Sequence, residues 1–236
     1  LLRHCSAHRI TPIFINHSNN NVNLDNLLPD NKKDEHYSRD WEGFNGNEKF
    51  WRGNKPYYLP VGYIAEGIKV DNFIENTCVA FHGTKAKYIS SIVNEGFKLP
   101  SERGGVEEDR IALNTPLFGI PNWAKAVFVS PSVKYAALYS GREHIVARTQ
   151  EHIFVESGHV VHDLIRIIIL QVRVKPNSFK EFPSTITMFH DSDPHYTDDS
   201  IEWRIENKKD VFPYRVLFKF IPANEFLNSF KEQTLL

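Results

Sequence analysis

Cysteine is scarce in this sequence, in which Cys5 and Cys78 are the two cysteines among 236 residues. Their wide separation gives neither a disulfide framework nor the spacing of a zinc site. So low a cysteine content fits a reducing compartment. The first four residues, Leu-Leu-Arg-His, do not form a signal peptide, and the missing initiator methionine suggests a fragment or a processed chain. We therefore expect an intracellular protein, cytoplasmic or nuclear.

The sequence also lacks long apolar runs and an excess of either charge. No stretch approaches the roughly 18 apolar residues that a transmembrane helix needs, so no membrane partner is expected. The 28 basic and 29 acidic residues give a net charge of −1, which offers no general attraction to nucleic acid or anionic lipid. Hydrophobic residues make up 41%, an ordinary share for a globular protein, and the length allows one large domain with a substantial core.

Residues 1–56 have the composition of an extension rather than of a core. The stretch 16–31 is rich in asparagine and is followed by Lys-Lys-Asp-Glu at 32–35. Such a segment buries too little apolar surface to offset the entropy lost on ordering. Residues 9–15 can still dock as an edge strand, because Pro12 confines a strand to an edge. The main domain is expected to span residues 57–236.

The main domain is predicted to be α+β with much sheet. Helices are expected to begin at Thr84 and at Ser130-Pro131, each a good capping signal. The stretch 98–122 is predicted to be a long loop, either a lid or a solvated connection. Residues 141–163 are polar and are expected to be irregular. Short runs rich in β-branched and aromatic residues predict strands at 64–70, 74–81, 126–130, 166–174 and 214–221, and alternation predicts a strand at 201–205.

The segment His82-Gly83-Thr84 ends one of these strands. Gly83 leaves the backbone bare beside the histidine, which allows a ligand to approach closely. Thr84 then caps a helix that is expected to end at Gly96. Two interpretations remain open: a strand-end histidine poised over a pocket, or a turn whose histidine is merely hydrogen-bonded.

Two periodic patterns place polar side chains on defined faces. Tyr135 and Tyr139 lie four residues apart on one face of a helix, as part of the core or as a ligand platform. In the strand 201–205, Glu202 and Arg204 point to the face opposite the three apolar residues.

The stretch 189–199 contains two histidines and four aspartates. His190 and His195 with these aspartates could form a metal site. The same residue types are typical of a solvated, turn-rich loop, and this is the interpretation we adopt, with no metal expected.

Three pieces of the chain, in this order, resemble the catalytic domain of the poly- and mono-ADP-ribosyltransferases of the diphtheria-toxin-like type, the PARP-like fold. That family carries a His-Tyr-Glu signature on three separate strands. Phe81-His82-Gly83-Thr84 is similar to its histidine motif. Ala126-Val127-Phe128, with Tyr139 eleven residues after Phe128, is similar to its tyrosine strand and the helix that follows. Residues 201–205 and 214–220 are similar to its glutamate strand and the next strand, and 171–176 with Pro213-Tyr214 resemble a eukaryotic subgroup. The likeness spans about residues 57–222.

The resemblance implies a fold of two packed, mostly antiparallel sheets with a few flanking helices, and transfer of ADP-ribose from NAD. A carboxylate from Glu202 would stabilise the positive charge that develops on the ribose. His82 would hold the adenosine-side ribose, and the backbone of Gly83 would pair with the nicotinamide amide. Phe128 and Tyr139 would sandwich the ring. Because no glycine-rich loop of the Rossmann type is present, NAD is expected to be a substrate rather than a hydride carrier.

The site implied by the resemblance also includes Thr84. The sequence departs from the family at two other positions of this site. Phe128 stands where the family has tyrosine, and Ala136 where many members have a serine that contacts nicotinamide. These changes keep open an alternative, a weak or inactive module that binds NAD, ADP-ribose or a protein partner. The RNA 2′-phosphotransferase branch of the fold would call for a more basic surface. The aspartates of 189–199, a loop that contacts the acceptor in the family, favour a protein acceptor over nucleic acid, with mono-ADP-ribosylation favoured over poly.

Overall fold

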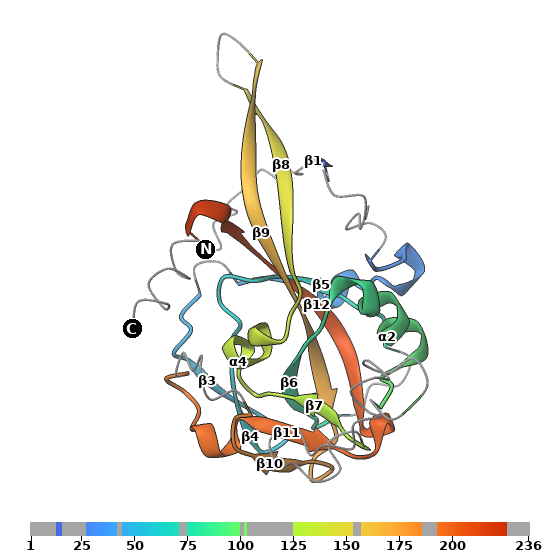
Figure 1. Ribbon diagram of the computed structural model, residues 1–236. Coiled ribbons are helices and arrows are strands. Elements are labelled where there is room, and N and C mark those ends of the chain that lie inside the picture. Colours follow the sequence, from blue (N-terminus) through green and yellow to red (C-terminus); the bar gives the residue numbers. More distant parts are fainter. Residues whose placement is uncertain are drawn as a thin grey trace, which may run out of the picture. The chain divides into compact units, whose positions relative to one another are not determined.

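The computed structural model describes residues 13–15, 27–41, 44–70, 75–99, 102, 125–152, 157–185 and 193–225. The described part of the chain is mostly β, with antiparallel strand pairs and a few short helices (Figure 1). This confirms the expectation of antiparallel sheets with few helices. None of the helices among these residues is long and apolar enough to cross a membrane.

The chain forms two compact units that are discontinuous in sequence. The first comprises Leu1–Asn23, Arg142–Arg166 and Phe220–Leu236, and the second comprises Leu24–Gly141 and Ile167–Lys219. In the first unit, β1 (Ile13–Ile15) pairs with β8 (Arg142–His152), which neighbours β9 (Ser157–Val174). Residues 141–163 were predicted to be irregular, and this prediction was wrong for 142–152 and 157–163, which lie in β8 and β9. Polar residues form these strands because their backbone groups pair with a neighbouring strand. Such pairing involves residues distant in sequence and cannot be predicted from local composition.

The second unit contains all the sequence-predicted site residues. Its helices are α2 (Ile89–Glu95) and α4 (Val133–Leu138), with short 3₁₀ turns η1 (Asp30–Lys32), η2 (Glu35–Tyr37), η3 (Ala86–Tyr88), η6 (Asp198–Ser200) and η7 (Lys208–Asp210). Its strands are the C-terminal part of β9, most of β12 (Val211–Pro222), and β2 (Arg39–Asp40), β3 (Lys49–Arg52), β4 (Lys55–Tyr58), β5 (Ile64–Gly67), β6 (Cys78–Gly83), β7 (Val127–Val129), β10 (Lys180–Phe182) and β11 (Glu202–Ile205).

The core of this unit lies around β9. Residues 167–172 of β9 are buried, which explains why the sequence reads as a continuous apolar run rather than an alternating one. β6 pairs antiparallel with β9 from Cys78↔Val174 to Gly83↔Ile169. β12 neighbours β9 on one side and pairs with β5 on the other.

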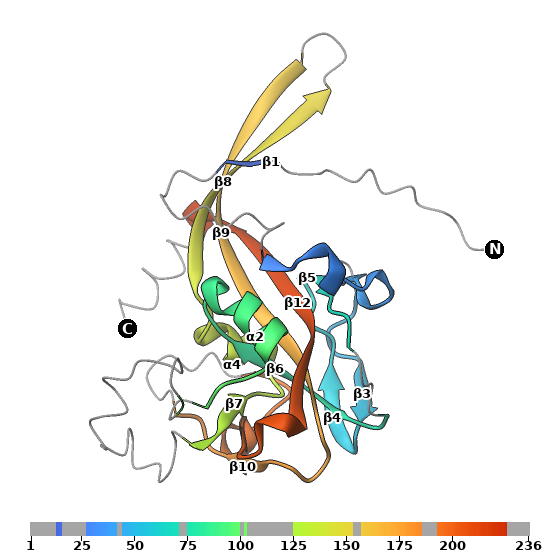
Figure 2. The same ribbon diagram turned by 90° about the vertical axis from the view of Figure 1, so that its right-hand side faces the viewer.

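A small sheet carries two of the proposed site residues. β11 pairs with both β10 and β7, and the three short strands are grouped together in Figure 1, while β7 and β10 are also seen near each other in Figure 2. Phe81 and Ser130 form an isolated bridge, with N···O distances of 2.7 and 2.9 Å, that connects β6 to the end of β7. The ends of β6, β7 and β11 are therefore held next to one another.

The helices begin later than the sequence predicts. Ser132, not Ser130, caps α4, because its hydroxyl accepts from the N–H of Tyr135 at 3.0 Å. Thr84 does not cap a helix: η3 follows from Lys85 without a side-chain cap, and α2 continues from it. The predicted end of α2 is confirmed, since Gly96 has φ +80° and donates to the carbonyl of Ile92.

Residues 24–56 belong to the second unit and include structure that composition did not indicate. β3 and β4 form a hairpin whose turn residues, Gly53 and Asn54, have φ of +56° and +63°. Two consecutive positive φ values are the mark of a type I′ turn. Gly53 is also needed for packing, since a Cβ there would lie 2.4 Å from the backbone N of Cys78. The predicted long loop at 98–122 lies largely outside the described residues.

Candidate functional site

Glu202 lies at the start of β11 and is 3% exposed. Its Oε1 accepts from Nε of Arg204 at 2.9 Å. Its Oε2 accepts from the hydroxyls of Tyr135 at 3.2 Å and Thr185 at 3.0 Å. A buried carboxylate is costly unless it is paired and hydrogen-bonded, and this one has both kinds of partner.

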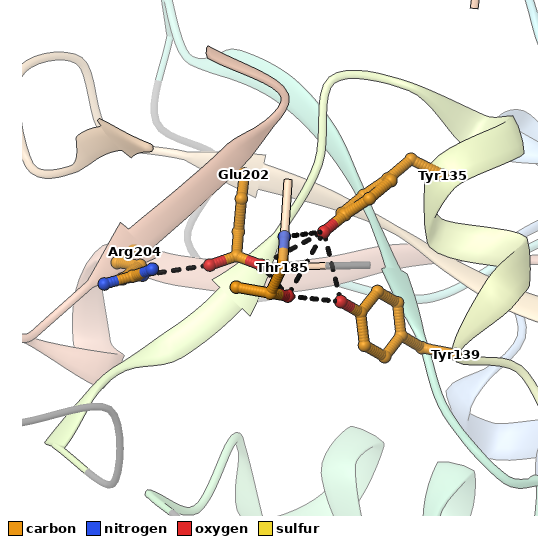
Figure 3. Close-up of polar contacts among 5 residues, drawn as sticks. All are labelled: Tyr135, Tyr139, Thr185, Glu202 and Arg204. Carbon is orange, nitrogen blue, oxygen red and sulfur yellow. Dashed lines mark hydrogen bonds and ion pairs between the residues drawn. The ribbon is translucent and has the colours of Figure 1, made fainter. Parts of the chain in front are cut away.

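The hydroxyl groups around Oε2 form a connected network (Figure 3). The hydroxyl of Tyr135 accepts from the backbone N–H of Thr185 at 3.0 Å, so its own proton is free to point to Glu202. The hydroxyl of Tyr139 lies 2.8 Å from that of Thr185 and 3.1 Å from that of Tyr135. The Thr185 hydroxyl donates its proton to Glu202, so it accepts from the hydroxyl of Tyr139. Both hydrogen bonds therefore point the same way, from Tyr139 through Thr185 to the carboxylate.

Arg204 approaches the carboxylate from the side away from the tyrosines (Figure 3). Its guanidinium lies 3.7 Å from the ring centroid of Phe182 and 5.5 Å from that of Phe128. The strand register explains this arrangement, because Phe128 is directly opposite Arg204 and Phe182 is directly opposite Glu202. Arg204 is 9% exposed and is held by one charge-assisted hydrogen bond and two aromatic faces.

His82 lies near the end of β6 and is half-buried. Its Nδ1 lies 2.8 Å from the carbonyl oxygen of Phe128. A carbonyl can only accept, so Nδ1 carries the proton and Nε2 is left as an acceptor in the neutral ring. Burial lowers the pKa of His82 below its ordinary value, while the bond to the Phe128 carbonyl opposes that shift. The ring of Phe97 packs edge-on against His82 with 4.9 Å between centroids.

Gly83 follows His82 and is in close contact with α4. A Cβ at Gly83 would lie 1.9 Å from the carbonyl oxygen of Ala136 and 2.9 Å from Cβ of Tyr139. The bare side of this glycine therefore faces the helix, which gives it a packing role whether or not its peptide groups bind a ligand. Ala136 is buried in α4.

The two tyrosines of α4 have different environments. Tyr135 is 4% exposed and belongs to the core, whereas Tyr139 is 44% exposed and presents an open ring beside Gly83. The core interpretation therefore holds for Tyr135, while the platform interpretation of Tyr139 stays a prediction. Thr84 is buried, and its carbonyl accepts from the N–H of Gly141 at 3.1 Å.

In the described part of the acidic stretch, Asp198 and Asp199 are exposed as expected, whereas Asp193 is not. Asp193 is buried, accepting from the hydroxyl of Ser132 at one carboxylate oxygen and from the N–H of His195 at the other. The ring of His195 stacks on Tyr58 with centroids 4.0 Å apart. The expectation that Asp193 is solvated was therefore wrong, because it ties this turn to the cap of α4. Asp191 and His190 lie outside the described residues.

The main residues singled out in the sequence lie on four elements and are linked through contacts with their neighbours. His82 is on β6, Phe128 on β7 and Glu202 on β11, with Tyr139 at the end of α4. Sequence reasoning assigned no site role to Arg204 or Thr185, and for Tyr135 it left open both the core and a ligand platform. Alternation placed Arg204 on the face of Glu202, and helical spacing paired Tyr135 with Tyr139, but no local signal marks Thr185.

The comparisons with known proteins do not identify a family, so the site is interpreted from the chemistry of its own residues. A scan against models of protein families and a search of curated proteins found no match to this chain. Across the described ranges, no group of three His, Cys, Asp or Glu side chains is placed to hold a metal ion.

Proposed function

We propose that this chain transfers ADP-ribose from NAD to a macromolecular acceptor, with a protein acceptor and a single ADP-ribose favoured, on a PARP-like fold. The observation that supports it is that two series of contacts lead from the pair His82-Gly83 to one buried carboxylate. The first passes from His82 to the carbonyl of Phe128 and on through Arg204 to Glu202. The second passes from Gly83 to Tyr139 and through Thr185 to the same carboxylate.

The reaction suits a fixed carboxylate. The bond between C1′ of the ribose and the nicotinamide nitrogen breaks, and its electron pair leaves with nicotinamide. Positive charge then develops on the sugar, and a preorganised carboxylate stabilises it without reorganising. The acceptor nucleophile forms a new bond to C1′ and releases its proton. NAD is consumed as a substrate, with no change in oxidation state.

Each remaining residue has a role that its geometry permits. Nε2 of neutral His82 can accept a hydrogen bond from a ribose hydroxyl. The half-buried ring of Phe128 and the exposed ring of Tyr139 are aromatic faces on which nicotinamide could stack, each contact contributing about 0.5–1.5 kcal/mol. Phe128 supplies the face without the hydroxyl of a tyrosine.

Replacing Glu202 by Gln tests the proposal. The amide keeps the shape of the side chain but removes the charge, so turnover of NAD should fall by about 10²–10³-fold while NAD binding persists. Transfer of labelled ADP-ribose gives the rate, and calorimetric titration gives the affinity. Glu206→Gln is the matched control, because Glu206 follows the same strand and pairs with the exposed Lys180 at 3.1 Å. Full activity in E202Q would refute the role of Glu202.

A second candidate function is a binding module for NAD or ADP-ribose without turnover. It is favoured by one specific observation: Glu202 is 3% exposed and both of its oxygens already accept from protein groups. The absence of hydroxyls at Phe128 and Ala136 points the same way. Calorimetry and a nicotinamide-release assay on the unmodified protein separate the two functions, because a binding module shows a titration without release.

A further inference from the structure

Among the described residues, the hydrogen bonds of Glu202 leave one acceptor position open. An ionised carboxylate offers about four lone-pair positions, two on each oxygen. Tyr135 and Thr185 use both positions on Oε2, and Arg204 uses one on Oε1. The position that remains is on Oε1, the oxygen that Arg204 holds.

Arg204 is itself fixed more firmly than an ordinary surface arginine. Its planar group lies against Phe182 on β10 and near Phe128 on β7, the two strands that flank β11. A planar guanidinium can occupy such a position against two rings, whereas a lysine ammonium is a compact point charge with different hydration. The side chain therefore has little freedom to rotate away from Oε1.

We propose that Arg204 is a positioning residue for Glu202: its Nε–H fixes Oε1 so that the last lone pair of that oxygen accepts a hydroxyl group of the substrate. In so far as it concerns catalysis, this inference rests on the proposed function, in which the hydroxyl belongs to the ribose of NAD next to the bond that breaks. Arg204 makes no contact with the reacting atoms in this scheme and acts through the carboxylate alone.

Rescue by free guanidinium tests the positioning role without relying on catalysis. Arg204→Ala should leave a gap beside the carboxylate that guanidinium can enter. We expect guanidinium at about 1–20 mM, far below the molar concentrations that denature, to raise the Tm of R204A by about 2–4 °C. It should not do so in R204A/E202Q, which lacks the carboxylate charge. Arg215→Ala is the matched control, because Arg215 also stacks on a ring, that of Tyr214 at 4.7 Å, but binds Gln171 rather than Glu202.

Kinetics provide the second measurement. R204A should lose about 10–100-fold in kcat with little change in the KM for NAD, the scale of one hydrogen bond to a charged group. Guanidinium should restore part of kcat in R204A and none in R204K, in which the lysine stem fills the gap.

The outcomes separate the inference from the proposed function. Equal Tm gains in R204A and R204A/E202Q, or in R215A, would overturn the positioning role. A Tm gain confined to R204A in a protein that never cleaves NAD would support the positioning role and refute the proposed function. If R204A does not fold, Arg204→Met keeps an apolar stem between the rings without the donor. The changes in denaturation midpoint caused by R204M and by E202Q should then not add in the double variant R204M/E202Q. If they do add, the inference is overturned.

Discussion

Gly83→Ala is the substitution whose effect can be worked out most directly from the structure. The added Cβ would lie 1.9 Å from the carbonyl oxygen of Ala136, whereas ordinary van der Waals contact begins at 3.4 Å. The helix backbone must therefore retreat by about 1.5 Å, and no flexible side-chain end is available to absorb the shift. Overpacking of a well-packed core costs about 1–3 kcal/mol, and a backbone contact this short places the cost near the upper limit.

The backbone term acts in the opposite direction but is smaller. Alanine in a strand is favoured over glycine by about 0.5–1 kcal/mol. The net expectation is a loss of about 2 kcal/mol in the free energy of unfolding, measured by urea denaturation. The displacement should also move Tyr135 and Tyr139 away from Glu202, because both are carried by the displaced segment.

Gly46→Ala is the matched control. A Cβ at Gly46 would meet Cγ2 of Val61 at 3.4 Å, an ordinary contact, so the free energy of unfolding should change by no more than about 0.5 kcal/mol. If G83A is as stable as the unmodified protein, the close packing of α4 on β6 is refuted, and with it the second series of contacts from Gly83 to the carboxylate.

Three further predictions concern His82 and the acidic turn. Burial lowers the pKa of His82 in the folded state, so the unfolded state binds a proton first as the pH falls. The stabilising contribution of the neutral, buried His82 is therefore complete above about pH 6.5 and is lost as the pH drops toward the folded pKa. His82→Asn keeps a donor for the Phe128 carbonyl and removes the titration, so urea denaturation between about pH 5 and 7.5 should show a shallower pH dependence; an unchanged slope would contradict this. Asp198 and Asp199 are exposed in η6, so replacing both by Asn should weaken modification of basic protein acceptors and spare hydrolysis of NAD to free ADP-ribose; equal loss of both activities would place the turn on the NAD side. Asp193→Asn should instead lower the Tm, because it weakens the buried contact with Ser132, and an unchanged Tm would argue against that role.

The local sequence was sufficient to predict β5, β6, β7, β11, β12 and the apolar part of β9, and how their side chains alternate. Apolar runs were sufficient to predict β6 and β7, because such runs are stable only when buried, whatever they are packed against. Alternation was sufficient to place Glu202 and Arg204 on one face of β11, since that periodicity is a property of the extended backbone itself. Glycine at position 96 was sufficient to end α2, because its positive φ is a local property too.

Only the tertiary structure decided what those side chains meet. Thr185 reaches Glu202 because β10 pairs with β11 and the N–H of Ser184 bonds to the carbonyl of Asp198, contacts between residues distant along the chain. β8 is a strand because its neighbours supply backbone partners, although its own polar sequence suggested irregular structure. Asp193 is buried because Ser132 lies within reach of it. In each case the stabilising partner is remote in sequence, so the free energy that selects the conformation arises from pairing and packing that no local pattern encodes.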